Sequence, residues 1–392
     1  MVRAGVAAAV PAEVLAFRRR FSIFESKVHL ATNAKGALAD VVADANAEYL
    51  ESWRTEGAPW GLWAQRHEEL RAAFAKLIGA KTEEIAVCPA ATSALGVLAS
   101  CFEWREGRPA IAFDDYSFPS VTYLWHAQAQ RGAEVRRVAP DAAGELRPEA
   151  FDPVLDEDLR LLSVAHVCYK NGHRVDLPAL VERAHAVGAL LVVDDYQSCG
   201  SRPLDVHAAG IDVLTAGTVK FMLGSPGVAF LYVAEHLHAD LHPTLTGWFG
   251  QRNPGDFQVE RNDEAPDAAR FQVGTPAIPA VFDSLAGIEL IAGVGLEAIG
   301  AWIDSLTALL IDRLDEEGFV PATPRDPAKR GPQVAIRTTA MDEAVAELAA
   351  RGLIVSSRDD NIRVAFHYYN TPEDIEALIA ALHSLGGLMV RR

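Results

Sequence analysis

Short apolar runs alternate with amphipathic stretches through the middle of the chain. The runs expected to form buried strands are residues 85–90, 108–114, 133–140, 159–167, 189–196, 213–219 and 228–234. Stretches with helical spacing of apolar residues lie between them, such as 92–104 and 176–188. Regular alternation of strands and helices is typical of a mostly parallel, doubly wound sheet. The pattern therefore predicts an α/β fold.

The pattern changes near Pro276. Residues 279–314 have helical spacing over an unusual length, and shorter strand and helix patterns follow as far as the C-terminus. A chain of 392 residues is also too long for one ordinary core. The organisation we predict has three parts, namely an N-terminal segment (1–35) that packs with the small domain, a large domain (36–278) and a small C-terminal α/β domain (279–392).

A further helical pattern runs from Asp40 to Gly79 near the start of the large domain. Leu70, Phe74 and Leu77 share one face of it, and Gly79 is suited to end a helix because glycine readily adopts the left-handed conformation found there. We therefore expect a helix that ends at Gly79.

Composition excludes several classes of function. A formal net charge of −17 argues against nucleic acid or an anionic membrane as the main partner. No stretch approaches the length needed to cross a bilayer, and the apolar run at the N-terminus is too short for a signal sequence. The cysteines, which lack C-x-x-C spacing, predict neither a disulfide framework nor a zinc site, and we expect no bound metal: Cys88, Cys101, Cys168 and Cys199. We expect reduced thiols in a soluble, cytoplasmic protein.

Two polar clusters follow predicted strands, at the sheet edge where α/β proteins place their active sites. Asp194 and Gln197 come directly after the strand that ends at Val193. A carboxylate fixed there can pair with a protonated ring nitrogen, as pyridoxal phosphate (PLP) chemistry requires, but it can equally cap a turn. Lys220 lies between an apolar strand and a loop rich in glycine and proline. Burial would give it the neutral amine that forms a Schiff base, although a surface lysine in a loop is an equal alternative.

Two more clusters suit the remaining parts of such a cofactor. Thr92 and Ser93 open a helix after the strand at 85–90, so free backbone N–H groups there could bind a phosphate. An ordinary helix cap is the commoner explanation. Tyr116 or Phe118, which follow the next strand, could stack on a flat ring or pack the core.

The order of these clusters, phosphate cap, aromatic residue, carboxylate and lysine, resembles the class V branch of the fold-type-I PLP enzymes. That branch includes kynureninase, cysteine desulfurases and isopenicillin N epimerase. The resemblance runs over nearly the whole chain, and residues 165–233 are especially close to the kynureninase pattern, as are TGWFG and ARFQVGTP further on. The segment NIRVAFHYYNTPEDIEAL matches the C-terminal block of the family. The resemblance implies PLP as the cofactor and an amino acid as the substrate.

The resemblance also implies roles for individual residues. Lys220 forms the internal aldimine and later moves the proton between the substrate's Cα and the cofactor, by way of a quinonoid. Asp194 pairs with the pyridine nitrogen, Gln197 lies near the phenolic oxygen and Phe118 stacks on the ring. Arg363 binds the substrate carboxylate, a role that suits the planar fork of a guanidinium.

Other matched positions concern the phosphate, the substrate and the assembly. Ala91, Thr92 and Thr218 match positions at the phosphate. Asn171 matches a residue that contacts substrate or cofactor. Trp248 and Thr275 match positions that approach the phosphate from a neighbouring subunit, so the resemblance implies a homodimer with active sites at its interface.

Two departures from the family limit the reaction. Kynureninases carry a tyrosine just before the lysine and desulfurases a histidine, whereas Val219 stands here and cannot donate a proton. Persulfide-forming desulfurases also need a cysteine in the C-terminal third, and the last cysteine here is Cys199. We therefore predict an aminotransferase, with a PLP-dependent lyase or epimerase or a kynureninase-like hydrolase as alternatives, and no persulfide chemistry. A non-catalytic binding protein is disfavoured because the lysine, the aspartate and the arginine are all present.

Overall fold

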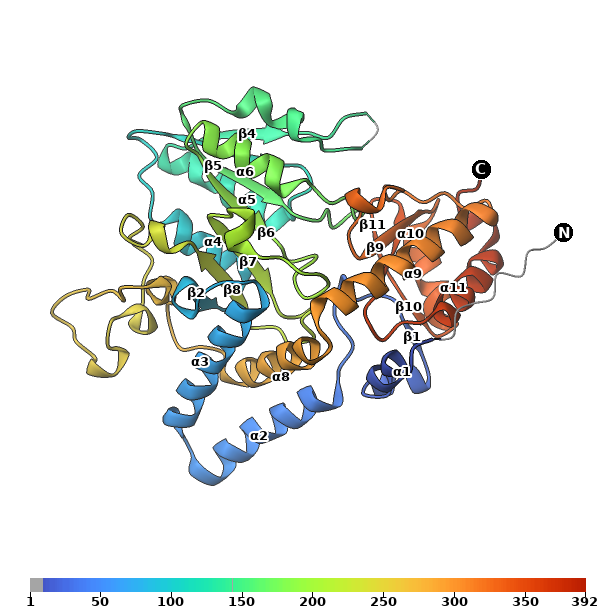
Figure 1. The fold of residues 1–392 in the computed structure, drawn as a ribbon, viewed down its shortest axis with the longest axis horizontal. Helices are drawn as coiled ribbons and strands as arrows, with labels where there is room; N and C mark the ends of the chain where they lie inside the picture. Colours follow the sequence, from blue (N-terminus) through green and yellow to red (C-terminus); the bar gives the residue numbers. More distant parts are fainter. Residues whose placement is uncertain (1–9, 143) are drawn as a thin grey trace.

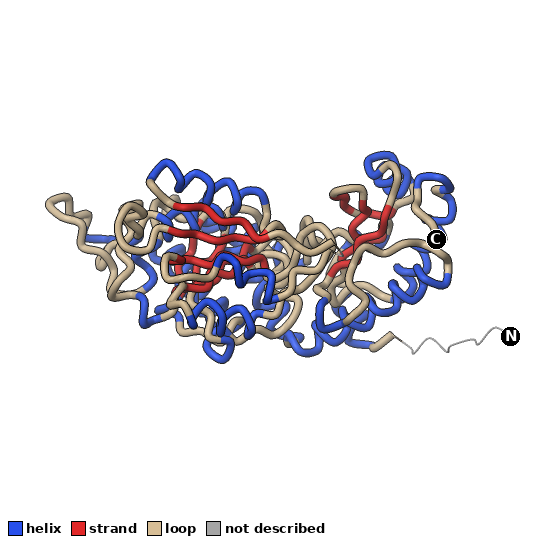
Figure 2. Tube along the Cα trace, turned by 90° about the horizontal axis from the view of Figure 1, so that it is seen from above, coloured by secondary structure: helices blue, strands red, loops and turns tan. Residues whose placement is uncertain are grey.

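A larger and a smaller α/β part make up the fold (Figures 1 and 2). The computed structural model describes residues 10–142 and 144–392. The strands fall into two separate groups, and helix α9 (Leu296–Glu316) runs from the larger part into the smaller (Figures 1 and 2). The first nine residues of the predicted N-terminal segment lie outside the described residues.

The described residues of the larger part form a seven-stranded sheet. In order across it, the strands are β2 (Ile85–Cys88), β8 (Ala229–Val233), β7 (Val213–Gly217), β6 (Leu190–Asp194), β5 (Leu159–Ala165), β3 (Ala110–Asp114) and β4 (Glu134–Val138). β8 runs antiparallel to both of its neighbours, and the other neighbouring strands are parallel. Each predicted strand is present, and the predicted fold class is confirmed.

Helices connect these strands, as parallel strands require. The α-helices in these connections are α4 (Ala91–Ala99), α5 (Pro119–Gln128), α6 (Leu177–Ala186) and α7 (Val206–Ala209). Most residues of β2, β3, β5, β6, β7 and β8 are fully buried, which explains why these strands are continuous apolar runs in the sequence.

Two of the predicted long helices are interrupted. The pattern from Asp40 to Gly79 forms α2 (Asp40–Glu56) and α3 (Trp60–Leu77) instead of one helix. Gly57 between them has a φ of 76°, which a continuing α-helix does not allow. In the same way, residues 279–314 divide into α8 (Ile278–Val294) and α9 at Gly295, whose φ is 92°.

The smaller part contains a sheet with the strand order β11 (Ser356–Arg358), β12 (Asn361–Ala365) and β9 (Gln333–Arg337), all antiparallel. The α-helices of this part are α9, α10 (Met341–Ala350) and α11 (Pro372–Ser384). The short 3-10 helices of both parts and of the N-terminal segment are Ser22–Glu25, Thr82–Glu84, Ala129–Arg131, Pro148–Val154, Glu235–Leu237, Trp248–Gly250, Pro254–Asp256, Ala268–Phe271, Pro327–Lys329 and Gly386–Leu388.

The N-terminal segment lies against this smaller part. Strand β1 (Val28–His29) pairs in parallel with β10 (Leu353–Ile354). Arg18, at the end of α1 (Ala12–Arg18), forms an ion pair of 2.8 Å with the buried carboxylate of Asp374. α8 instead packs against α2 and α3, so we propose that the larger part extends to the break at Gly295 and does not end at residue 278.

No single helix within residues 10–142 and 144–392 is long and apolar enough to cross a bilayer. α8 and α9 reach that length and apolarity only when taken together, and they meet at an angle of 80°.

Candidate active site

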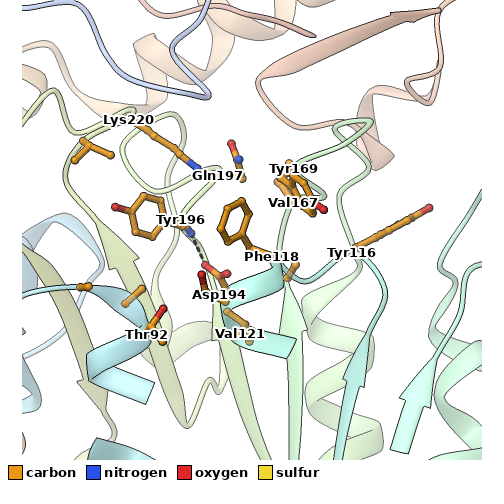
Figure 3. A pocket seen from close by; sticks show the side chains of 15 residues that line it. Thr92, Tyr116, Phe118, Val121, Val167, Tyr169, Asp194, Tyr196, Gln197 and Lys220 are labelled. Atoms are coloured by element: carbon orange, nitrogen blue, oxygen red, sulfur yellow. Dashed lines mark hydrogen bonds between the residues drawn. The ribbon is translucent and has the colours of Figure 1, made fainter. Parts of the chain in front are cut away.

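A cavity of about 290 Å³ opens at the carboxyl ends of the parallel strands (Figure 3). Five segments, each following a strand of the central sheet, supply its walls. The lining residues are Ala90, Ala91, Thr92, Tyr116, Phe118, Ser120, Val121, Ala165, Val167, Tyr169, Asp194, Tyr196, Gln197, Val219 and Lys220. The structure therefore brings together in one cavity six residues predicted from the sequence: Ala91, Thr92, Phe118, Asp194, Gln197 and Lys220.

Lys220 projects into the cavity from the loop after β7, and its Nζ lies 4.6 Å from the centre of the Tyr196 ring (Figure 3). Burial lowers the pKa of this amine to about 8, and the charge of Arg363 adds to the effect while that of Asp194 opposes it. At pH 7 roughly a tenth of the side chains would then carry a neutral amine, far more than for a free lysine. The environment of Lys220 therefore favours the neutral amine, which can act as a nucleophile or as a base.

Asp194 is the last residue of β6, and its carboxylate is buried in the cavity floor. Burial raises the pKa of this group to about 6, although a hydrogen bond of 3.0 Å from the Tyr196 N–H to Oδ1 and the charge of Lys220 both favour the ionised form. Asp195 does not line the cavity, because it bonds to His166 at 2.6 Å and accepts from Ser198. A cation placed above Asp194 would stabilise its charge.

Aromatic rings and an amide border the space above Asp194. Figure 3 shows the rings of Phe118 and Tyr196 on either side of this space, with Gln197 across it from Asp194. Phe118 is 42% exposed, and Tyr169 meets it edge-on at 5.1 Å. The side-chain amide of Gln197 is buried, and its oxygen has no hydrogen-bond partner among the described residues. A buried amide oxygen without a partner is rare, and a bound flat ring with a hydrogen-bond donor on its edge would supply the partner for Gln197.

One end of the cavity is bounded by the start of α4. Ala90, Ala91 and Thr92 line it there, and no side chain of the described residues caps the helix. The first N–H groups of a helix have no partner within the helix, and they attract anions. Together with Lys220, Asp194 and Gln197, this arrangement suits a flat ring that carries a phosphate.

Several predicted residues lie outside the cavity wall. The Thr218 hydroxyl is buried, donates to the Ser225 carbonyl at 3.0 Å and accepts from Ser284 at 3.0 Å, so it supports the loop beside Lys220. The side-chain oxygen of Asn171 accepts a hydrogen bond of 2.9 Å from the His173 N–H.

Arg363 lies behind Tyr169, on β12 of the smaller part. Its Nη1 donates to the Tyr169 carbonyl at 2.6 Å, and its buried Nε has no partner among the described residues. Burial lowers the pKa of this guanidinium to about 10. The Arg363 side chain thus has an unused N–H donor and contacts Tyr169, a residue of the cavity wall.

Trp248 and Thr275 also lie away from this cavity. Trp248 packs against Trp60, with ring centres 6.0 Å apart, and against Phe249 and Phe257. Thr275 is exposed. The structure of one chain therefore does not bring either residue to the lysine.

Sequence reasoning missed three features of the site. Tyr169 and Tyr196 line the cavity, but aromatic residues after strands usually pack the core and give no further signal. Tyr196 fits only because residue 217 is glycine, since a Cβ there would lie 2.1 Å from its ring. Gly36, directly after the N-terminal segment, donates to the Val219 carbonyl at 2.8 Å, a contact between residues far apart in the sequence.

Replacing Gly36 with alanine tests how closely this segment supports the lysine. The new Cβ would lie 2.5 Å from the Lys220 carbonyl oxygen, so the loop must shift. We expect a loss of about 1–3 kcal/mol in the free energy of unfolding and weaker cofactor retention, measured by thermal unfolding and absorbance. Gly61→Ala is the matched control, because nothing lies within 4 Å of its Cβ. Equal behaviour of the two variants would contradict the supporting role.

Comparisons with known proteins agree with this geometry. Residues 28–378 match the family model described as Aminotransferase class-V. An uncharacterized aminotransferase, YcbU, of Bacillus subtilis (strain 168) is 34% identical over 93% of this chain and 95% of its own length. A kynureninase of Geobacillus thermodenitrificans (strain NG80-2) is 27% identical over 88% and 85%, respectively.

Solved structures with low sequence identity share the fold. A cysteine desulfurase from Thermococcus onnurineus NA1 superposes with a TM-score of 0.86 at 23% identity, over 97% of this chain and 98% of that one. A C-DES mutant with glycine covalently linked to the PLP cofactor superposes with a TM-score of 0.85 at 21% identity, over 93% and 98%.

Proposed function

Because the chain belongs to the class V aminotransferase family and its cofactor is pyridoxal phosphate, we propose that it is an aminotransferase acting on an α-amino acid. The observation that carries the proposal is the meeting of Lys220 and Asp194 in one cavity, with the pKa of each shifted by burial. Strongly perturbed groups with complementary charges are typical of catalytic sites.

The residues present fit the cofactor. Lys220 would hold it covalently, Asp194 would hold a proton on the ring nitrogen, Gln197 would take a polar edge of the ring, and the start of α4 would bind the phosphate. When bound, PLP supplies an electron-withdrawing ring that stabilises the carbanion left when Cα of the substrate loses its proton. Phe118 would cover one face of the ring and exclude water.

The chain's own residues can carry the proton transfers that all reactions of this family need. The lowered pKa of Lys220 makes its amine a suitable base for the proton on Cα. The same amine, once protonated, can return the proton to a different carbon, as transamination requires. Arg363 would hold the substrate carboxylate through its free Nε.

Two rival reactions are disfavoured, one by the residue beside Lys220 and the other by the state of the cysteines. Val219 lines the cavity next to the lysine and provides no proton donor, so a kynureninase-like hydrolysis lacks support there. Three of the four cysteines are buried, and burial raises the pKa of all four thiols, for Cys199 well above its ordinary value. Thiols of that kind do not form the reactive thiolate that persulfide chemistry needs.

We also propose a homodimer in which the partner completes the phosphate site. Trp248 and Thr275 lie outside the cavity of their own chain, and the surface beside Trp248 exposes Trp60 and Phe257, the latter to 72%. Exposed apolar side chains of this size are typical of interfaces. Light scattering should give twice the mass of the chain, and a fully active monomer would contradict the proposal.

Amino-group transfer is the direct test of the proposed reaction. The PLP-loaded protein is incubated with a panel of amino acids, with and without a 2-oxo acid. We expect a new amino acid, detected by chromatography, only when both partners are present. The reason is that an aminotransferase must pass the amino group on before its next turnover.

Other outcomes would favour the alternatives. Release of ammonia and a 2-oxo acid without an acceptor would indicate a lyase, and inversion of the substrate's chirality an epimerase. Turnover of kynurenine would indicate a hydrolase. Lys220→Ala, which lacks the proposed base, serves as the control for non-enzymatic transfer.

A further inference from the structure

Two arginines share one face of the β11–β12 hairpin in the smaller part. Ser356 pairs with Arg363 and Arg358 pairs with Asn361 across the two antiparallel strands. Paired residues lie on the same face of a sheet, and so do residues two apart along one strand. Arg358 and Arg363 therefore project from the same face.

A tight turn holds this hairpin in register. Asp359 and Asp360 connect the strands, with φ angles of 50° and 56°. Two successive residues with positive φ are the geometry of a two-residue hairpin turn of the favoured type. Asn361 reinforces it, because its amide donates to the carbonyls of Arg358 and Asp359. The separation of the two arginine backbones is thus fixed by the fold.

Both guanidinium groups lie beside Tyr169, which lines the cavity. Arg363 donates to the Tyr169 carbonyl, and the Cζ of Arg358 lies 5.9 Å from the centre of its ring. Figure 3 shows Tyr169 on the wall opposite Lys220. A substrate bound covalently near Lys220 would extend toward the two arginines.

The positive charge at this wall is only partly paired. Lys170 pairs with Asp359 at 2.7 Å, whereas Arg358 forms no ion pair with any residue that the structure describes. The charge of Arg358 acts on Arg363 and, after burial, is the largest cause that lowers the pKa of that group. Arg358 is exposed, so two positive charges on one face beside the cavity are open to a ligand that carries two anionic groups.

We propose that the substrate is an α-amino acid with a second carboxylate: Arg363 binds the α-carboxylate and Arg358 the carboxylate of the side chain. This inference rests on the proposed function, since it names the substrate class of the same site. A monocarboxylic substrate would neutralise Arg363 and leave Arg358 without a counter-ion. A dicarboxylic one satisfies both, each through the fork geometry of a guanidinium.

Isosteric substrate pairs test the inference. The kcat/KM values for aspartate and asparagine, and for glutamate and glutamine, are compared with the PLP-loaded protein and a 2-oxo acid. We expect the acidic member of at least one pair to be preferred by roughly 10- to 100-fold, the value of a hydrogen bond to a charged group. In Arg358→Gln that ratio should fall to about one. Arg351→Gln is the control, because Arg351 is exposed and pairs with Glu347 on α10.

A binding measurement separates this inference from the proposed reaction. Succinate and glutarate are titrated into the PLP-loaded protein beside butyrate, with calorimetry as the readout. We expect the dicarboxylates to bind more tightly than butyrate, and Arg358→Gln, but not Arg351→Gln, to remove the difference.

The two proposals fail in different ways. Amino-group transfer without preference for acidic substrates, or a preference that Arg358→Gln leaves intact, would overturn the dicarboxylate inference and leave the aminotransferase proposal standing. Absence of transfer, together with dicarboxylate binding that depends on Arg358, would overturn the reaction and leave the binding inference standing.

Discussion

Replacing Lys220 with alanine is expected to lower kcat by roughly 10³- to 10⁴-fold, the size of effect that a positioned acid–base group supplies. The variant loses both the covalent link to PLP and the amine that takes the proton from Cα. Purified wild type treated with borohydride should retain PLP on Lys220 after unfolding, detected by mass spectrometry, and the variant should retain none. Lys81→Ala is the control, because Lys81 is exposed and its ion pair is with Glu235, which is exposed as well. Full activity of Lys220→Ala would overturn the assignment of the site.

The pH dependence of cofactor capture gives a second measure of the same group. Only the neutral amine attacks the aldehyde of PLP. Because burial lowers the pKa of Lys220 to about 8, the capture rate of cofactor-free protein should rise as pH increases through about 8 and then level off. Stopped-flow absorbance measures this rate. A rise that continued beyond pH 10 would indicate an ordinary, exposed lysine.

Asp194→Asn is expected to lower kcat by roughly 10²- to 10³-fold, as the loss of one fixed electrostatic partner typically does. Asparagine keeps the shape and can still accept from the Tyr196 N–H, but it cannot hold a proton on the ring nitrogen. Asp195→Asn is the matched control, since that side chain bonds to His166 and does not line the cavity. It should lower thermal stability more than turnover. A larger loss of turnover in Asp195→Asn than in Asp194→Asn would contradict the assignment and give the catalytic role to Asp195.

Thermal unfolding of the cofactor-free protein tests the burial of Asp194 independently of activity. The pKa of Asp194 is raised to about 6 from an ordinary 3.8, so ionisation destabilises the folded state above pH 6. Asp194→Asn removes this cost and should unfold at a higher temperature than wild type at pH 7 to 8. The difference should shrink as pH falls from 6 toward 4 and disappear below about pH 3, where the wild-type carboxyl is protonated in both the folded and the unfolded state.

The strands were predictable because their cause is local. A strand covered on both faces must be apolar at nearly every position, and β5 to β8 have that composition in the sequence itself. The breaks at Gly57 and Gly295 were not predictable in the same way. Apolar spacing continues across each glycine, and only the packing of α8 against α2 and α3 shows that the chain must turn there.

The residues of the candidate site likewise differ in how far the sequence could predict their positions. Lys220, Asp194 and Phe118 each follow a strand, and parallel strands bring their carboxyl ends to one edge, so the sequence alone implied that they meet. The roles assigned to Trp248 and Thr275 concern a second chain, and the hydroxyl of Thr218, expected near the phosphate, bonds to Ser225 and Ser284 in this chain. Residue type and order do not specify where a hydroxyl points.

The amino-acid sequence on its own predicted the α/β architecture, because the composition of buried strands depends on near neighbours. Its resemblance to a known family added the cofactor and the expected role of Lys220. The shifted pKa values of Lys220 and Asp194 arise only from folding, since desolvation depends on everything packed around a group. The same holds for the approach of Gly36 to the Lys220 loop and for the pair of arginines beside Tyr169. These contacts join residues more than a hundred positions apart, and no local pattern encodes them.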